Sequence, residues 1–422
     1  MKKTLQALAL LLVAHFGLAQ GSLIEDEQTS YGEPFEIDVA GFAWGNLPDQ
    51  WDLSPFAPPV MDQQGGTCVG ASMYCAMSTL VNSHFNVTSP THKELMAFDP
   101  YFIYTAMNEG DHLPCDLGLI AADAIENLAY HGTMRDIMSE DFTCDFMWRD
   151  PIAGTLVPSA WVNFYAANPF KGFDYREFKA KKNGKWLQQM KYAISNNLPV
   201  IISTDVGDSF ANETEGGTID ESGLWQTEFV SSNMGGHAMC VIGYDDNIHG
   251  GALRIRNSWG IGFGKGGDFW IRYDDFPEIT KRCYSLLPQY WWEYHDDNDD
   301  AANSIFFELQ PTGSPDYDYV RVEGEGGVYE GFVSKTGSAV TGIELYDDGS
   351  GYFGLFSDTM KHGIGMYVAA DGKRTKCAFE RGEQVACPQE FEPKNEFERI
   401  VWNKVARLSP HSTSIPKINY YE

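Results

Sequence analysis

The sequence predicts an α+β protein with two lobes, a helical one and a β one, followed by a small all-β domain built from hairpin repeats. The first observation is the order of the patterns, because helical periodicities dominate up to residue 196 and short β-rich runs follow. The second is an internal repeat of 23 residues near the carboxyl end, which is typical of repeated hairpin units. Aromatic residues make up 14% of the chain and supply material for two cores.

Residues 1–19 have the pattern of a signal peptide. Lys2 and Lys3 precede an apolar run from Leu5 to Val13, and the segment closes on small residues at Gly17 and Ala19. The run is too short to span a bilayer, and no later segment is long and apolar enough to do so. We therefore expect a secreted protein, extracellular or periplasmic, with no transmembrane span.

Net charge excludes several partners. The formal charge of -29 becomes still more negative when the two leader lysines are removed, and it repels phosphate backbones and anionic membranes. Nucleic acid is therefore not expected as a partner. The chain contains neither the His-Glu-x-x-His pattern of zinc peptidases nor the Gly-x-Ser-x-Gly pattern of serine hydrolases. No cofactor and no metal are expected.

Composition divides the exported chain further. Residues 296–300 read Asp-Asp-Asn-Asp-Asp, which indicates a linker, because the ligand spacing and the turn glycine of an EF-hand calcium loop are missing. The expected segments are an acidic N-terminal segment at 20–46, a main domain at 47–295, an acidic linker at 296–303, a β-repeat domain at 304–389 and a tail at 390–422.

Periodicity places helices before strands in the main domain. Apolar positions from Ala71 to Val81 recur at helical spacing, which predicts a helix beginning near Gly70 with one buried face. Further helices are expected at 117–130 and 185–196. Strands are expected at 198–203, 238–244, 252–256 and 268–273.

Three residues together have the chemistry of a thiol nucleophile. Cys68 falls at the N-terminus of the first predicted helix, where the helix dipole and a neighbouring imidazolium would lower the thiol pKa. His237 lies after Gly235 and Gly236, at the start of a buried strand. Asn257 follows one strand later and can orient the imidazole, with Trp259 excluding water.

The segments around these residues resemble the motifs of papain-like cysteine peptidases. The resemblance rests on Gly66-Thr67-Cys68-Val69-Gly70-Ala71-Ser72, on Gly-His-Ala at His237, and on Asn257-Ser258-Trp259-Gly260-Ile261-Gly262-Phe263-Gly264. Residues 47–63 and 190–203 extend it to roughly 47–295. It implies a two-lobed fold with a cleft between a helical and a β lobe, and cleavage of peptide bonds through an acyl-enzyme.

The resemblance also implies an oxyanion-hole glutamine and a disulfide. Gln63 fits the glutamine, although it lies one residue closer to the cysteine than in the family pattern, and Gln64 stays open as a substitute. Gly65 replaces a family cysteine and Val69 a family aromatic residue. Cys115 begins a segment similar to the family's Cys-Asn-Gly-Gly turn, which implies a disulfide between Cys115 and Cys144.

The other cysteines are interpreted from their surroundings. Cys377 and Cys387 flank a turn at Arg381-Gly382, and we expect them to form a local disulfide. Cys75 and Cys240 fall on apolar faces of a helix and a strand, so they are expected to be core thiols. The sequence does not determine the state of Cys283.

The repeat region has its own resemblance. Tyr329-Glu330-Gly331 recurs 23 residues later as Tyr352-Phe353-Gly354, and Gly342 recurs as Gly365. Residues 350–372 resemble a MORN repeat, and the copy before them does so more loosely. We expect hairpins that bury their faces by stacking on one another, and a role in binding a protein or a surface.

The combined prediction is a secreted cysteine-type peptidase, an endopeptidase that acts on proteins or peptides. Two alternatives stay open: a binding protein that keeps the fold without hydrolysis, and an acyltransferase in which an amine intercepts the acyl-enzyme. The presence of Cys68, His237 and Asn257 favours hydrolysis, because a non-catalytic relative is expected to lack one of them.

Overall fold

The computed structural model describes most of the chain between residues 47 and 408. The described residues are 33–34, 47–107, 118–138, 173–181, 185–207, 210, 219–226, 234–288, 316–388, 390, 392–394 and 396–408. The expected signal peptide, the linker at 296–303, and both Cys115 and Cys144 lie outside them. No helix in these ranges is long and apolar enough to cross a membrane.

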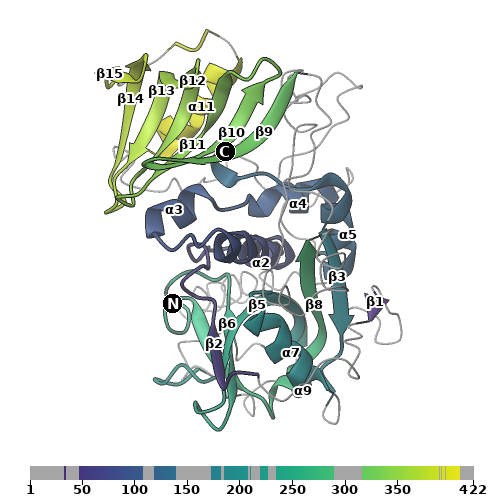
Figure 1. The fold of residues 1–422 in the computed structure, drawn as a ribbon. Coiled ribbons are helices and arrows are strands. Elements are labelled where there is room, and N and C mark those ends of the chain that lie inside the picture. The colour runs from purple at the N-terminus through teal and green to yellow at the C-terminus, as the bar shows by residue number, and fades with distance from the viewer. Residues whose placement is uncertain are drawn as a thin grey trace, which may run out of the picture.

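Helices form the first lobe of the main domain (Figure 1). They are α2 (Cys68–His84), α3 (Pro90–Leu95), α4 (Pro100–Met107), α5 (Ala121–His131) and the short 3-10 helix η2 (Asp136–Met138). Helix α2 begins two residues before the predicted start, and α5 lies within the region predicted to be helical except for its last residue. Ser89 caps the N-terminus of α3, where Pro90 occupies the first turn.

An eight-stranded sheet forms the second lobe. Its strands are β1 (Glu33–Pro34), β2 (Gln50–Asp52), β3 (Phe173–Phe178), β4 (Val200–Gly207), β5 (Met234–Asp245), β6 (Ala252–Arg256), β7 (Asp268–Arg272) and β8 (Thr280–Pro288). They pair in the order β1-β3-β8-β4-β5-β6-β7, with β2 added to β5, and every pair except β1-β3 is antiparallel. Helices α7 (Trp186–Ser195) and α9 (Phe276–Ile279) complete this lobe. The predicted helix-to-strand order is confirmed.

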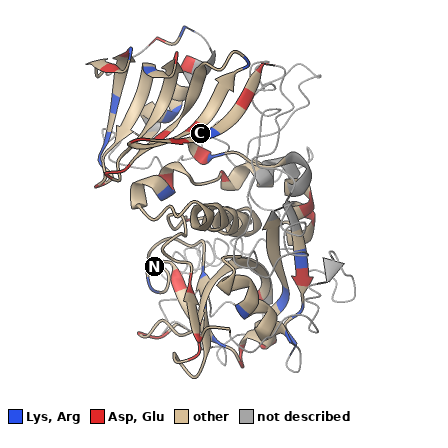
Figure 2. Ribbon diagram, in the orientation of Figure 1, with Lys and Arg blue, Asp and Glu red and all other residues tan. Residues whose placement is uncertain are grey.

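Helix α2 is the centre of the main domain. It carries no Lys, Arg, Asp or Glu (Figure 2), and it is buried from Cys68 to Asn82. One side packs on β5, and another approaches α4 at Gly70, where an added Cβ would lie 2.3 Å from the Pro100 carbonyl oxygen. A helix surrounded on all sides can be this apolar, whereas the sequence predicted only one buried face.

The C-terminal part is a seven-stranded antiparallel sheet in simple consecutive order (Figure 1). Its strands are β9 (Tyr317–Gly324), β10 (Gly327–Ser334), β11 (Ala339–Tyr346), β12 (Gly351–Ser357), β13 (Met360–Val368), β14 (Arg374–Glu380) and β15 (Glu383–Ala386). Helix α11 (Glu396–Leu408) follows and packs on β12, β13 and β14. The predicted all-β character is therefore correct for 317–386, and the tail contributes a helix that sequence reasoning did not assign.

Two glycines and a tyrosine explain the 23-residue period. Gly354 and Gly365 pair across β12 and β13, and the Tyr352 ring lies over both. A Cβ at either position would come within 2.3 Å of the Tyr352 hydroxyl oxygen. The preceding copy repeats this packing with Tyr329, whose ring lies over the paired Gly331 and Gly342. The repeat therefore encodes one ring packed over glycines in adjacent strands.

The expectation that the hairpins stack on one another is wrong. They lie edge to edge, because each strand satisfies its backbone hydrogen bonds with the next strand in the chain. Apolar side chains on the inner face, including Phe353, Ile364 and Met366, belong to the same continuous core as the main domain. Val401 and Val405 of α11 join that core.

A buried ion pair joins the sheet to the helical lobe. Glu330 on β10 accepts from Arg135 Nε at 2.9 Å, and neither side chain is exposed to solvent. Glu330 also accepts from Arg321 Nη1 at 2.9 Å and from the Tyr319 hydroxyl at 2.6 Å, while the Arg135 guanidinium lies 4.2 Å from the Phe98 ring centre. Burial raises the pKa of Glu330, but the two guanidinium groups outweigh burial and the pKa is lowered.

Polar contacts at α3 complete this interface. Ser89 Oγ and Thr91 Oγ1 donate to the carbonyl oxygens of Gly349 and Ala369, at 3.1 Å and 3.0 Å. His92 Nε2 lies 2.8 Å from the Ser350 carbonyl oxygen. The turns after β11 and β13 are therefore attached to one short helix of the main domain.

The structure contains a disulfide between Cys377 and Cys387, the pair that the sequence suggests. It joins β14 to the residues after β15 and stabilises the last hairpin. Cys68, Cys75, Cys240 and Cys283 are thiols in this structure.

Replacing Glu330 by Gln should destabilise the protein by about 3–5 kcal/mol, because Arg135 is then buried without its counter-charge. Lys335→Ala is the control, since its 2.6 Å pair with Asp318 is 42% and 46% exposed and should contribute about 0–1 kcal/mol. Urea unfolding of the full chain measures both. Because the folded pKa of Glu330 is lowered, its contribution is present above the unfolded pKa and is lost as pH falls through the folded value. Equal losses in the two variants would contradict this account.

Candidate active site

Cys68 is the first residue of α2, as predicted. Thr67 precedes the helix, and its hydroxyl donates to the Gln64 carbonyl oxygen at 2.9 Å, which fixes the turn that leads into the helix. Gly65 in this turn has a φ of 54°, a conformation that a side chain would strain. The sulfur therefore lies at the positive end of a 17-residue helix, where a thiolate is stabilised.

The sulfur of Cys68 also contacts strand β5. The backbone N–H of Ala238 donates to Cys68 Sγ at 3.4 Å. A hydrogen bond to sulfur favours the ionised form of a thiol, as the helix dipole does. Since Ala238 directly follows His237, this contact places the nucleophile candidate beside the backbone of the base candidate.

His237 and Asn257 meet across β5 and the end of β6. His237 Nε2 lies 2.8 Å from Asn257 Oδ1, and the same oxygen accepts from the Ser258 N–H at 2.8 Å. The Ser258 contact identifies Oδ1, because an amide nitrogen in that position would face another donor. Asn257 is fixed in turn by its own N–H, which donates to the Gly267 carbonyl oxygen at 2.9 Å.

This arrangement determines the tautomer of His237. Asn257 Oδ1 can only accept, so Nε2 must carry a hydrogen and donate it. In the neutral ring, Nδ1 is then the atom with a lone pair, and it makes no hydrogen bond to a residue that the structure describes. Asn257 therefore holds His237 in the orientation and tautomer in which Nδ1 can accept a proton.

Burial keeps the imidazole neutral. His237 is completely buried, and this lowers its pKa to about 4, although the hydrogen bond to Asn257 acts in the opposite direction. The sequence suggested that a neighbouring imidazolium would lower the thiol pKa. Burial instead favours a neutral imidazole at pH 7, whose unprotonated Nδ1 can accept a proton.

Aromatic rings surround the imidazole. Trp259 packs on His237 with ring centres 4.8 Å apart and an angle of 32° between the planes. Phe210 lies 5.2 Å from Trp259 and 6.4 Å from His237, and Phe263 lies 5.2 Å from Trp259. Sequence reasoning assigned the water-excluding role to Trp259 alone and missed Phe210, which stands in no recognisable motif.

A short β-bridge joins the segment before the nucleophile to the Asn257 loop. Asp62 pairs with Trp259, and the Gln63 N–H donates to the Ser258 carbonyl oxygen at 2.7 Å. The Gln63 side chain accepts from the Ser258 hydroxyl at 2.5 Å and donates to the Gly65 carbonyl oxygen at 2.8 Å. The side chain of Gln63 is therefore buried and anchored at the site, whereas Gln64 is exposed.

The structure thus brings Gln63, Cys68, His237 and Asn257 to one place. Sequence reasoning missed the role of Ser258, which holds both Asn257 and Gln63, although this residue lies in the quoted Asn-Ser-Trp motif. The disulfide expected between Cys115 and Cys144 is not described.

Comparison with protein families gives one match. The family model described as papain family cysteine protease matches residues 168–285. That range holds His237 and Asn257, and it ends after the first residues of β8. Cys68 and Gln63 lie outside it, so their assignment depends on the geometry above. A search of curated proteins finds no match.

Solved structures similar to the chain include several cysteine peptidases. Xylellain, a cysteine protease from Xylella fastidiosa, is 20% identical with a TM-score of 0.46, and the match covers 64% of this chain and 96% of that one. ProCathepsin B S9 from Trypanosoma congolense is 15% identical with a TM-score of 0.46, over 64% and 86% of the two chains. Digestive procathepsin L 3 of Tenebrio molitor larval midgut is 15% identical with a TM-score of 0.42, over 65% and 77%.

The imidazole of His237 should stay neutral down to about pH 4 in the folded protein and titrate near its ordinary value of about 6.5 in denaturant. NMR of ring-labelled histidine measures both. Since the folded pKa is lowered, the unfolded chain binds the proton first, and stability should fall as pH drops from about 6.5 towards 4. A native-state titration near 6.5 would show that the ring is solvated.

Proposed function

We propose that the protein is a secreted cysteine-type endopeptidase that hydrolyses peptide bonds through a thioester acyl-enzyme on Cys68. The observation that supports this most directly is the combination of the His237–Asn257 hydrogen bond with the Ala238 N–H contact to Cys68. The family match over residues 168–285 supports the same reaction class. This support is independent of the assignment of Cys68, because Cys68 lies outside the matched range.

Each residue has a proposed role in the reaction. His237 Nδ1 takes the proton from the Cys68 thiol, and the thiolate attacks the carbonyl carbon of the peptide bond. The same ring nitrogen then gives the proton to the leaving amine, and a water molecule hydrolyses the thioester. Asn257 keeps the ring in the tautomer that these transfers need, and it does not itself exchange a proton.

Gln63 is the proposed oxyanion donor, together with backbone N–H groups at the start of α2. Its support is positional: the side chain is buried, and Ser258 and Gly65 hold both ends of its amide. A preorganised donor stabilises the negative oxygen without reorganising as the oxygen develops charge. The shorter spacing to Cys68 would be absorbed by the turn at Gly65.

Export to an oxidising compartment is also proposed. It is supported by the signal-like pattern of residues 1–19 and by the disulfide between Cys377 and Cys387, since disulfides persist outside reducing compartments. For the C-terminal sheet we propose binding of a protein or a surface. The face opposite α11 carries the MORN-like tyrosines: Tyr329 is partly exposed there beside Tyr346, whereas Tyr352 is buried beneath them and would support such contacts only through packing.

The Cys68→Ala variant should lose all detectable cleavage of a peptide library, while Cys283→Ala, which removes another buried thiol, should keep it. A thiol-directed epoxide should label Cys68 and abolish cleavage in the wild type. Cleavage that persists in Cys68→Ala would overturn the proposal. A folded wild type without turnover would favour the binding protein, and transfer to an added amine would favour the acyltransferase.

Gln63→Ala should lower kcat about 10²–10³-fold, the typical effect of removing one oxyanion donor, and Gln64→Ala should leave kcat nearly unchanged. The two variants form a matched pair, because they make the same change at adjacent positions, one buried and one exposed. Steady-state kinetics on one peptide substrate measure both. A large loss in Gln64→Ala with none in Gln63→Ala would reverse the assignment.

A further inference from the structure

A second pair of cysteines lies directly behind the candidate site. Cys75 is seven residues after Cys68 on α2, and Cys240 is three residues after His237 on β5. The packing of α2 on β5 makes the two thiols neighbours: Cys240 pairs with Arg256 across β5 and β6, and both thiols lie within the influence of that guanidinium and of each other. The pair therefore bridges the two elements that carry the proposed nucleophile and the proposed base.

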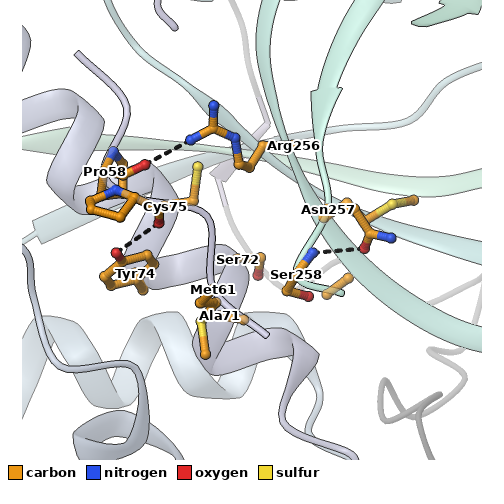
Figure 3. A pocket seen from close by; sticks show the side chains of 12 residues that line it. Pro58, Met61, Ala71, Ser72, Tyr74, Cys75, Arg256, Asn257 and Ser258 are labelled. Carbon is orange, nitrogen blue, oxygen red and sulfur yellow. Dashed lines mark hydrogen bonds between the residues drawn. The ribbon is translucent and has the colours of Figure 1, made fainter. Parts of the chain in front are cut away.

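The surroundings of the pair are enclosed and polar on one side. Cys75 is 3% exposed and Cys240 is fully buried, and the Thr79 hydroxyl lies 4.0 Å from Cys75 Sγ. Figure 3 shows the Cys75 side chain directed towards the guanidinium of Arg256, which forms an ion pair with Asp268. A guanidinium beside a thiol favours the thiolate, which is the reactive form in disulfide exchange.

The remaining thiols have other positions. Among the described cysteines, Cys377 and Cys387 are bonded to each other, and Cys68 is the proposed nucleophile. Cys283 is buried on β8, and no contact with another described cysteine is found for it. Cys75 and Cys240 are thus the pair of thiols that neighbour each other among the described cysteines.

We propose that Cys75 and Cys240 form a disulfide in the oxidised protein, a covalent bond that ties helix α2 to strand β5 behind the catalytic residues. The structure shows the reduced form of this pair. Nothing in the catalytic proposal requires the bond, and its test requires no turnover, so the two can fail separately.

The chemistry is ordinary thiol–disulfide exchange with a small-molecule or protein disulfide as the oxidant. The Cys75 thiolate attacks one sulfur of that disulfide and releases the first thiol, which leaves a mixed disulfide on Cys75. Cys240, as its thiolate, then attacks the Cys75 sulfur and releases the second thiol. The two cysteines lose two protons and two electrons, and the oxidant gains both as two thiols.

In the folded protein the pKa values of the two thiols are shifted in opposite directions. The pKa of Cys75 lies below its ordinary value because it accepts a hydrogen bond from Cys240 and lies near Arg256, whereas burial acts in the opposite direction. Burial raises the pKa of Cys240. Since both sulfurs are enclosed in the folded state, exchange would take place while the two lobes are coming together.

The test begins with the wild-type full chain, reduced and then refolded with oxidised glutathione. Remaining thiols are blocked with N-ethylmaleimide in denaturant without reductant, and the digest is mapped by mass spectrometry. We expect a cross-linked peptide pair that contains Cys75 and Cys240. Cys283 should carry the maleimide, and Cys377 should be linked to Cys387, which serves as the internal control for oxidation.

Maleimide on both Cys75 and Cys240 after this refolding would overturn the proposal. Linkage of either residue to a different cysteine in a chain with native unfolding behaviour would overturn it as well. The measurement uses no substituted protein in this step, so a variant that fails to fold cannot obscure the result.

A second measurement uses variants in a Cys377→Ala/Cys387→Ala background. A phosphine reductant should lower the thermal midpoint of the oxidised background protein by several degrees. Compared with the background protein, the fall in thermal midpoint on reduction should be smaller in Cys75→Ala and in Cys240→Ala, and equal in the two, since either substitution removes the same bond. In Cys283→Ala the fall should be as large as in the background protein. An unchanged drop in Cys75→Ala would show that no bond is formed there.

Discussion

The packing of helix α2 against strand β5 is the contact on which the rest of the site depends. It brings Cys68 Sγ within 3.4 Å of the Ala238 N–H, one residue from the imidazole. The helix can be enclosed on all sides because it carries no charged residue, and Gly70 lets it approach the chain at Pro100. A shift of one residue between helix and strand would separate the thiol from its base, so this packing sets the geometry of the proposed reaction.

The C-terminal sheet belongs to the same structural unit rather than to a separately tethered module. Its inner face joins the core of the main domain, and Glu330 reaches into the helical lobe to pair with Arg135. The buried ion pair has additional partners at Arg321 and Tyr319, and removing one member would leave a buried charge uncompensated at this interface. The C-terminal sheet, which was expected to serve only for attachment, therefore also holds helix α3 and the chain near η2 in place.

The candidate site residues were proposed from motifs that resemble those of papain-like cysteine peptidases, and the structure brings Cys68, His237 and Asn257 together. Helical periodicity alone predicted a helix beginning close to Cys68. The depressed pKa of His237 was not predictable, since it arises from burial by residues distant in sequence such as Phe210. The edge-to-edge order of the hairpins was missed because a 23-residue period does not say how successive hairpins pair. Helix α11 was missed because the period also does not say which segment covers the apolar face of the sheet. The partnership of Cys75 with Cys240 likewise depends on tertiary packing.

Trapping of the covalent intermediate tests the central claim most directly. The full-length protein is mixed with an activated ester of a short peptide, quenched in acid within one turnover, digested, and analysed by mass spectrometry. The account predicts one acyl group, attached as a thioester to the peptide that contains Cys68 and released by hydroxylamine. An acyl group on another residue, or a folded protein that forms no adduct, would contradict the assignment of Cys68 as the nucleophile.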